Sequence, residues 1–260
     1  MTATTTATIV SKTFKPTAEQ LVEILAKHKL WLRGEEGGER ADLSSADLSS
    51  ADLRSADLSS ADLRYANLRY ANLSYANLRY ANLSSADLHY ADLSSANLRS
   101  ADLSSADLSS ADLRYANLSS ANLRSANLSS ANLRSADLSS ADLHYADLSS
   151  ANLRSADLSS ANLRSADLSS ARLNYVIGNA CEVKSLQCGT YVVSYTATHM
   201  QIGCQTHELA QWFEFDARQI DRMDCQATTW WAVWKPILQA IIAVSPAVPI
   251  VLEDTETAAA

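Results

Sequence analysis

The side chains best suited to metal chemistry lie in the last third of the chain. Cysteine thiolates and histidine imidazoles are the usual ligands of structural zinc. The candidates are Cys181, Cys188, His199, Cys204 and His207. The spacing of Cys204 and His207 suits a ligand pair, but no second close pair accompanies it. Buried strand cysteines and surface histidines are the competing interpretation, so we expect no metal, no cofactor and no activated thiol.

A second set of polar groups, carboxylates beside serine hydroxyls, recurs every five residues through the middle of the chain. Because every unit repeats the same groups, no position is unique, and a solvated turn explains them without catalysis. The sequence also lacks a phosphate-binding glycine loop, a hydrolase nucleophile motif and a dinucleotide-binding motif. It therefore predicts a protein that is not an enzyme.

Arginine and tyrosine replace serine at some outer positions of these units. The arginines either form a patterned charged surface or serve to keep the protein soluble. Tyr65, Tyr70, Tyr75 and Tyr80 occupy four consecutive units. Exposed tyrosines can anchor a binding partner, and a packing ladder is an equally good explanation.

A period of five requires a backbone that turns a corner once per unit. Residues 41–175 form 27 units, each with Ala first and Leu third. On an α-helix, Leu at this spacing would step by about 140° and share no face. On a flat strand it would alternate between the two faces. Only a solenoid places every Leu inside, with coils bonded to one another through their main chains. Representative interior positions are Leu43, Leu48, Leu108, Leu168, Ala46 and Ala106.

The units ADLSS, ANLRS and ADLRY resemble the pentapeptide-repeat proteins. That family's motif is a small residue, Asp or Asn, Leu or Phe, then polar residues often ending in Gly. The resemblance covers about half of the chain and recurs in all 27 units. It implies a mainly β fold: a right-handed quadrilateral parallel β-helix with four units per coil. The array would then make just under seven coils, about 30 Å long at the spacing of neighbouring strands.

Two features depart from the family pattern. The fifth position is Ser or Tyr and never Gly, so we expect one uniform turn that tolerates L-residues without positive φ. The inward positions show no Phe, Cys, Val or Thr. This purity indicates a consensus-designed array between natural-looking ends, and a recently duplicated natural array is the alternative.

Four units per coil would place residues 20 apart directly above one another. Surface ladders should follow from this register. We expect one on a first face from Arg114, Arg134 and Arg154, one on the opposite face from Arg124, His144 and Arg164, and one on a third face from Tyr70 and Tyr90.

The open ends of a solenoid need caps, because they expose unpaired backbone. Residues 1–40 are interpreted as an N-terminal arm and capping helix. Thr17 and Gln20 have the spacing of a capping box, and Gly34 should end the helix. The stretch HKLWLRGEEGGERADLS is similar to the entry segment of several bacterial and phage pentapeptide-repeat proteins.

Beyond the array, residues 176–245 are interpreted as a small α+β domain that caps the last coil. Two or three short strands are expected, with a turn at Gly189–Thr190. Thr206 is expected to cap a first helix, and Pro236 to kink or interrupt a second one that is rich in tryptophan. Residues 246–260 should form an extended or disordered tail.

Charge and cysteine usage limit the partners. The formal net charge is -8, so we expect no attraction to nucleic acid or to an anionic membrane. The apolar run near the C-terminus is interrupted by Gln239, Pro246 and Pro249 and is too short to span a bilayer. The first residues lack the features of a secretion signal, so we expect a cytoplasmic protein with reduced thiols.

Three functions compete at this point. The first is a non-enzymatic structural scaffold, an idealised designed β-helix. The second comes from the resemblance: some family members are acidic rods that mimic duplex DNA, bind DNA gyrase and protect it from quinolones. The third is a phage accessory module that binds a partner through its C-terminal domain. No partner is certain, and self-association through that domain is a further possibility.

Overall fold

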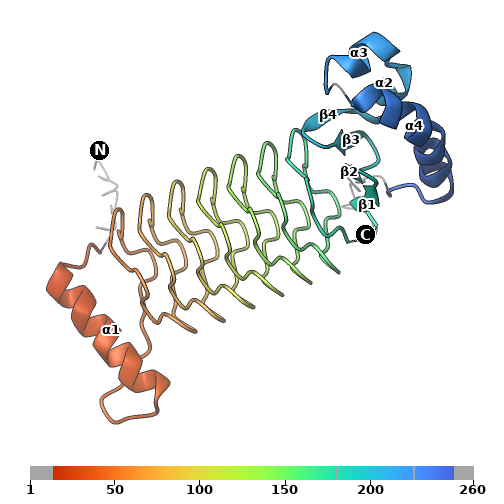
Figure 1. Ribbon diagram of the computed structural model, residues 1–260. Coiled ribbons are helices and arrows are strands. Elements are labelled where there is room, and N and C mark those ends of the chain that lie inside the picture. Colours follow the sequence, from red (N-terminus) through yellow and green to blue (C-terminus); the bar gives the residue numbers. More distant parts are fainter. Residues whose placement is uncertain (1–13, 180, 225, 249–260) are drawn as a thin grey trace, which may run out of the picture.

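The computed structural model describes residues 14–179, 181–224 and 226–248. Figure 1 shows a rod of stacked coils between a helix at the N-terminal end and a group of strands and helices at the C-terminal end. The expected arm up to residue 13 and the expected tail from residue 249 onward lie outside the described residues. None of the helices in the described ranges combines the length and apolarity needed to cross a membrane.

The rod is a four-sided parallel solenoid. Isolated parallel bridges join second-position residues 20 apart, from Asp42 with Asp62 to Asp157 with Ile177. Each unit before the last coil bonds to the next coil through its main chain. For example, the Leu43 amide donates to the Asp62 carbonyl at 2.8 Å, and the Asp62 amide donates to the Ala41 carbonyl at 3.0 Å. Since one coil takes 20 residues, it contains four five-residue units.

The interior is a column of leucine and alanine. Leu43, Leu48, Leu108, Ala46 and Ala106 are at most 2% exposed. Burying a leucine side chain contributes roughly 1.5–3 kcal/mol, and the gain recurs in each coil.

Leu168 corrects the expected interior set. It is only half-buried, although it packs against the core. The reason is its place in the last coil: the second-position bridges end with Ile177, so no further coil covers this side of the rod. The repeat pattern alone does not distinguish a terminal unit from an interior one.

The turn at each corner differs from the one expected. It is uniform, but the fifth residue of all 27 units has positive φ, between 55° and 60°. In the first unit the Ala46 amide donates to the Leu43 carbonyl at 3.1 Å. Ser45 has positive φ and Ser44 does not. Positive φ at the third of four turn residues, and not at the second, is typical of a type II turn. The expectation that Ser and Tyr exclude positive φ was therefore wrong.

Hydrogen bonds offset the strain of this conformation. The fifth residue's amide donates to the next coil, as Ser45 does to the Arg64 carbonyl at 2.8 Å. In addition, the second-position side chain accepts from the fourth-position amide, as Asp42 Oδ1 does from Ser44 at 3.0 Å. Asp and Asn both supply this acceptor oxygen, which explains why either residue can occupy the second position.

Replacing Ser105 with glycine should stabilise the protein. The φ of Ser105 is 56°, a region that costs an L-residue about 1–2 kcal/mol. Glycine removes this strain but has more conformational freedom in the unfolded chain, so we expect a net gain of up to about 1 kcal/mol.

The matched control is Ser104→Gly in the same turn, where φ is not positive. It should lower the free energy of unfolding by about 0.5–1 kcal/mol. Urea titrations measure both variants, and shifts in the same direction would contradict the assigned turn.

Helix α1 (Ala18–Leu32) lies across the N-terminal end of the rod (Figure 1). The expected capping box is confirmed: Thr17 accepts from the Gln20 amide, and the Gln20 side chain accepts from the Thr17 amide. Leu21, Ile24 and Leu25 pack against the rod core. The helix ends two residues before Gly34, which has a φ of 67°.

The C-terminal region contains one antiparallel sheet of four strands, where two or three were expected. The order is β1 (Lys184–Cys188), β2 (Tyr191–Tyr195), β3 (His199–Ile202) and β4 (Gln205–Glu208). The turn at 189–190 is confirmed, because it joins β1 to β2. Thr206 lies inside β4 and not at a helix start, so the cap assigned to it was wrong.

Three helices follow the sheet: α2 (Leu209–Glu214), α3 (Ala217–Asp221) and α4 (Ala227–Val244). The single helix expected before α4 is divided in two, and α3 starts with its own capping box from Asp216 and Gln219. α4 continues through Pro236, so the expected interruption there is absent. A separate apolar cluster joins sheet and helices around Tyr195, Met200, Trp212, Ile220 and Leu238.

Candidate functional site

The cysteines and histidines singled out from the sequence are dispersed: Cys188, His199 and His207 lie in three different strands, whereas Cys181 precedes β1 and Cys204 lies between β3 and β4. Cys181 and Cys204 are free and exposed, whereas Cys188 is free and buried in β1. Burial raises the pKa of Cys188 to about 11, which makes it a poor nucleophile. No three His, Cys, Asp or Glu residues in the described part of the chain lie close enough together to hold a metal ion.

The two histidines of this set have separate surroundings. His199 Nδ1 lies 2.9 Å from the Thr198 hydroxyl. The ring of His207 packs edge-on against Trp212 and Phe215, with centroids 5.1 Å and 4.9 Å away. Neither contact orients the imidazole toward a thiol, so the geometry gives these residues packing roles.

The carboxylates of the array serve the backbone. The second-position oxygen of each unit from 41 to 170 accepts from the amide two residues later, at distances such as 3.0 Å for Asp107 and 3.1 Å for Asp112. Amide groups of Asn also donate to the side chain one coil below, as Asn122 does to Asp102 at 3.1 Å. An Asn above an Asp replaces the repulsion of two stacked carboxylates with a hydrogen bond.

The structure places Arg114, Arg134 and Arg154 on one face. The amides of Tyr115 and Ser135 donate to the Arg134 and Arg154 carbonyls of the following coils. Arg114 forms an ion pair with Asp112 at 2.6 Å. The units of Arg134 and Arg154 carry Asn in place of Asp, so those units contain no carboxylate.

The second ladder lies on the opposite face, two units around the coil. The amide of Ser125 donates to the His144 carbonyl, and that of Tyr145 to the Arg164 carbonyl. These bonds place Arg124, His144 and Arg164 on successive coils. Arg124 also lies over the Tyr145 ring, 5.6 Å from its centroid.

Tyr70 and Tyr90 stack on a third face, with ring centroids 5.3 Å apart and planes 15° from parallel. The four tyrosines of one coil are all exposed, from 55% to 66%. They are Tyr65, Tyr70, Tyr75 and Tyr80. They form a band of aromatic surface around the rod.

His28 caps the first coil. It is fully buried; its Nδ1 accepts from the Ala41 amide at 3.0 Å, and its Nε2 donates to the Ser59 carbonyl at 3.1 Å. In the interior of the rod, equivalent carbonyls accept from the preceding coil. The imidazole therefore supplies the donor that a missing coil would supply. The sequence gave no sign of this backbone role for His28.

Two polar side chains cap the last coil in the same way. Gln201 Oε1 accepts from the Leu173 amide at 2.6 Å, and the Ser194 hydroxyl donates to the Leu173 carbonyl at 2.9 Å. The Asn174 side chain also bonds the Gly203 carbonyl. Gln201 and Ser194 are buried. Sequence reasoning missed both, because a polar residue in a short strand carries no signal of the backbone it will meet.

Acid should weaken the N-terminal cap. Burial lowers the pKa of His28; nearby Asp57 opposes this shift and Arg40 adds to it. Below the usual histidine value of about 6.5 the unfolded chain binds the proton more readily, so acid favours unfolding. The contribution of His28 is complete above that value and declines as the pH falls toward the folded-state pKa.

A His28→Gln variant tests this linkage. We expect the stability difference between the protein and the variant to be larger at about pH 8 than at about pH 5. Urea midpoints at the two pH values provide the measurement. An equal difference at both values would show that the ring's protonation does not control the cap.

Comparison with protein-family models agrees with this geometry. The family model described as pentapeptide repeats matches in 8 copies over residues 41–74, 66–104, 101–139 and 136–174. No curated protein matches the chain significantly.

Several solved structures are similar to parts of the chain. HetL from the cyanobacterium Nostoc sp. strain PCC 7120, a pentapeptide repeat protein involved in heterocyst differentiation regulation, is 44% identical; the match covers 53% of this chain and 68% of HetL, with a TM-score of 0.37. Rfr23 from the cyanobacterium Cyanothece 51142 is 38% identical over 39% of this chain and 63% of Rfr23, with a TM-score of 0.20. QnrB1, a plasmid-mediated fluoroquinolone resistance protein, is 23% identical over 49% and 71%, with a TM-score of 0.27.

Proposed function

Because this chain belongs to the pentapeptide repeat family, we propose that it is a non-enzymatic structural scaffold. Proteins of this family are generally structural or binding proteins built on a right-handed quadrilateral β-helix. The observation that carries the proposal is the regular rod, in which bridges join residues 20 apart from Asp42 to Ile177. The repeated polar groups of the rod form hydrogen bonds within its own turns. The role that remains for the rod is to hold its two ends at a fixed distance.

The closed ends support this role. An uncapped β-helix can add further chains at its exposed backbone. Here His28 at one end and Gln201 at the other satisfy backbone groups of the terminal coils. A rod that is stopped at both ends suits a spacer of fixed length between the N-terminal helix and the C-terminal region.

The origin of the array stays a prediction. Uniform Leu and Ala inside the rod favour consensus design. Ser and Tyr at positive φ in all 27 units favour the alternative, duplication of a natural unit, because a sequence chosen for stability would carry glycine there. A cytoplasmic location is likewise part of the proposal, as is the division of the chain at residues 40, 175 and 245.

A DNA mimic that binds gyrase is the second candidate. Mimicry requires a continuous band of negative potential along the rod. The second positions from Asn117 to Asn132 carry no carboxylate, and Arg124 and Arg134 add positive charge nearby. Like charges in an interface can cost several kcal/mol, so this coil of the rod is poorly suited to a basic DNA-binding surface.

The supercoiling activity of purified gyrase tests the two candidates against each other. We expect no inhibition at concentrations where dedicated DNA mimics act. Strong inhibition that weakens with added salt would overturn the scaffold proposal and would make the acidic Asp42–Asp62 part of the rod the contact surface. A third candidate, an accessory module that binds a partner through residues 176–245, would show itself as a protein retained by that region in a pull-down.

A further inference from the structure

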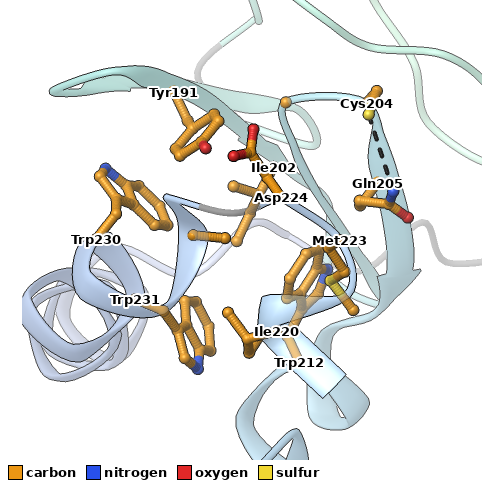
Figure 2. A pocket seen from close by; sticks show the side chains of 12 residues that line it. Tyr191, Ile202, Cys204, Gln205, Trp212, Ile220, Met223, Asp224, Trp230 and Trp231 are labelled. Carbon is orange, nitrogen blue, oxygen red and sulfur yellow. Dashed lines mark hydrogen bonds between the residues drawn. The ribbon is translucent and has the colours of Figure 1, made fainter. Parts of the chain in front are cut away.

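A groove of about 330 Å³ lies between the last coil of the rod and the C-terminal sheet. Its volume is within the range of about 300–1,000 Å³ that is typical of ligand sites. The cavity in Figure 2 is different: it measures about 50 Å³ and belongs to the apolar cluster around Trp212 and Trp231. The groove is lined by residues 165–169 of the rod and by Thr196, Thr198 and His199 at the connection of β2 to β3.

The rod side of this groove is an open backbone edge. In earlier coils the amides of the third and fifth residues donate to the next coil, as the Leu148 amide does to the Asp167 carbonyl at 2.8 Å. The equivalent amides of the last coil, at Leu168 and Ser170, have no acceptor in the described part of the chain. Leu168 is also only half-buried. An unpaired edge beside a partly uncovered apolar side chain can accept a further strand.

The C-terminal cap bonds the other three sides of this coil. Ile177, Asn179 and Gln201 each form a hydrogen bond with the backbone of one of them. The side formed by residues 166–170 receives no such bond from the described part of the cap. A strand from outside the rod can therefore reach it.

A parallel strand on this edge can form three backbone hydrogen bonds. The preceding coil shows the pattern, because the Asp167 amide donates to the Ala146 carbonyl at 2.9 Å while the next two coil-facing amides of that coil find carbonyl acceptors. A three-residue segment would likewise donate to Ala166 and accept from Leu168 and Ser170. Its middle side chain would point inward and cover Leu168.

The first residue of such a strand would lie above two stacked carboxylates. A parallel bridge joins Asp147 to Asp167. Each carboxylate uses one oxygen to accept from the amide two residues later, at 2.8 Å. No lysine or arginine among the described residues forms an ion pair with either. A basic side chain at this place would offset the repulsion of the two carboxylates, whereas an acidic one would add to it.

The opposite end of the rod already uses this arrangement. The series of bridges from Asp47 to Asp167 runs along one face. At the N-terminal end of that face the Asp47 amide donates to the Phe14 carbonyl at 2.8 Å, and Lys15 forms an ion pair with Asp47 at 3.1 Å. A segment outside the repeats thus covers the first coil through a backbone bond and a lysine beside the second-position carboxylate.

We propose that the edge formed by residues 166–170 binds an extended segment of a partner protein in which a lysine or arginine is followed by an apolar residue. Strand addition of this kind takes its affinity from main-chain hydrogen bonds and its specificity from alternate side chains. The basic residue would pair with Asp167, and the apolar residue would cover Leu168. This binding goes beyond the scaffold role proposed above and does not depend on it.

The last residues of the chain itself are a poor match for this edge. Residues 249–260 include Glu253, Asp254 and Glu256 but no lysine or arginine. They would bring further carboxylates to Asp147 and Asp167. Charge complementarity therefore favours a basic segment from another protein.

Fluorescence anisotropy of a labelled peptide, titrated with the full-length chain, tests the proposal. The probe is Ser-Ala-Lys-Leu-Ser-Ser with blocked ends. We expect it to bind and to slow amide hydrogen exchange at Leu168 and Ser170. The same peptide with glutamate in place of lysine should bind roughly tenfold more weakly. N-methylation of the lysine amide should also weaken binding, because it removes the donor to Ala166. Equal affinities for the three peptides, or no binding by the lysine peptide, would overturn the proposal.

Two aspartates of the last coil provide matched variants. Asp167→Asn keeps the oxygen that accepts from the Ser169 amide and removes the charge, so it should weaken binding of the lysine peptide several-fold. Asp157→Asn lies on the opposite side of the coil, where Ile177 already pairs with it, and should leave binding unchanged. Equal affinities for the two variants would show that Asp167 does not recognise the basic residue. Circular dichroism checks that both variants fold.

Two further measurements distinguish other occupants of the edge. Sedimentation of the full-length chain detects a second copy, and a chain that ends at residue 248 detects an effect of residues 249–260. Self-association that the lysine peptide abolishes would assign the edge to a second copy. Peptide binding that requires removal of residues 249–260 would assign it to those residues. Either result would overturn the proposal of a partner protein, and we expect neither.

Discussion

Leu108→Ala should lower the free energy of unfolding by about 2–5 kcal/mol. Leu108 is fully buried. It lies between the corresponding residues of neighbouring coils, Leu88 and Leu128, since bridges join Asp87 to Asp107 and Asp107 to Asn127. Shortening it leaves a cavity that neither neighbour can fill, because the hydrogen bonds between coils fix the spacing of their backbones.

Ser104→Ala is the control for this variant. Ser104 lies one unit earlier on the outer surface, and its amide, not its hydroxyl, donates to Asp102. We expect a change within about 0.5 kcal/mol. Ser109 is a poorer control, because its hydroxyl contacts both Asp107 and His89 at 2.6 Å. Similar losses for Leu108→Ala and Ser104→Ala in urea titrations would refute the division into interior and surface.

Deletion of residues 176–260 should convert the protein into multimers or fibres. The deletion removes Gln201 and Ser194, which bond the Leu173 backbone, and leaves the last coil as an open edge. Because all coils present similar edges, one uncapped end can pair with another without a defined stop. Light scattering of the truncated chain measures the result, and a stable monomer would show that the C-terminal region is dispensable as a cap.

A point variant tests the hydrogen bond of the cap without removing the rest of the C-terminal region. Gln201→Ala leaves the buried Leu173 amide without its acceptor, and an unsatisfied buried group costs about 1–3 kcal/mol. Gln211→Ala, at an exposed position of α2, should be nearly neutral. If both variants remain as stable as the parent, the bond at Leu173 does not hold the cap.

The repeat made the rod predictable. Leu every fifth residue is incompatible with a straight helix or strand, and four units per coil place Tyr70 against Tyr90. The capping box at Thr17 was predictable for a similar reason, because its two partners lie three residues apart in sequence. Patterns of this kind depend on local spacing, which a sequence displays directly.

The predictions that were wrong concern residues whose local structure depends on backbone groups far away in the sequence. Ser45 adopts positive φ because the coil must close and bond to Arg64, which outweighs the preference of serine itself. Thr206 joins a strand because β3 offers a partner, Gln201, across the sheet. The roles of His28 and Gln201 depend on backbone groups left over at the two ends of the rod, which only the assembled structure reveals.

The closure of each coil after 20 residues also sets an angle. Adding or removing one five-residue unit would preserve the Leu and Ala interior but rotate the C-terminal region by a quarter turn about the rod axis relative to α1. Only insertions of 20 residues would restore the original orientation while lengthening the rod by one coil spacing, about 4.8 Å. The number of units therefore sets the relative orientation of the two end regions as well as the length of the rod. Two arrays of equal stability can present their end regions on different sides of the same axis.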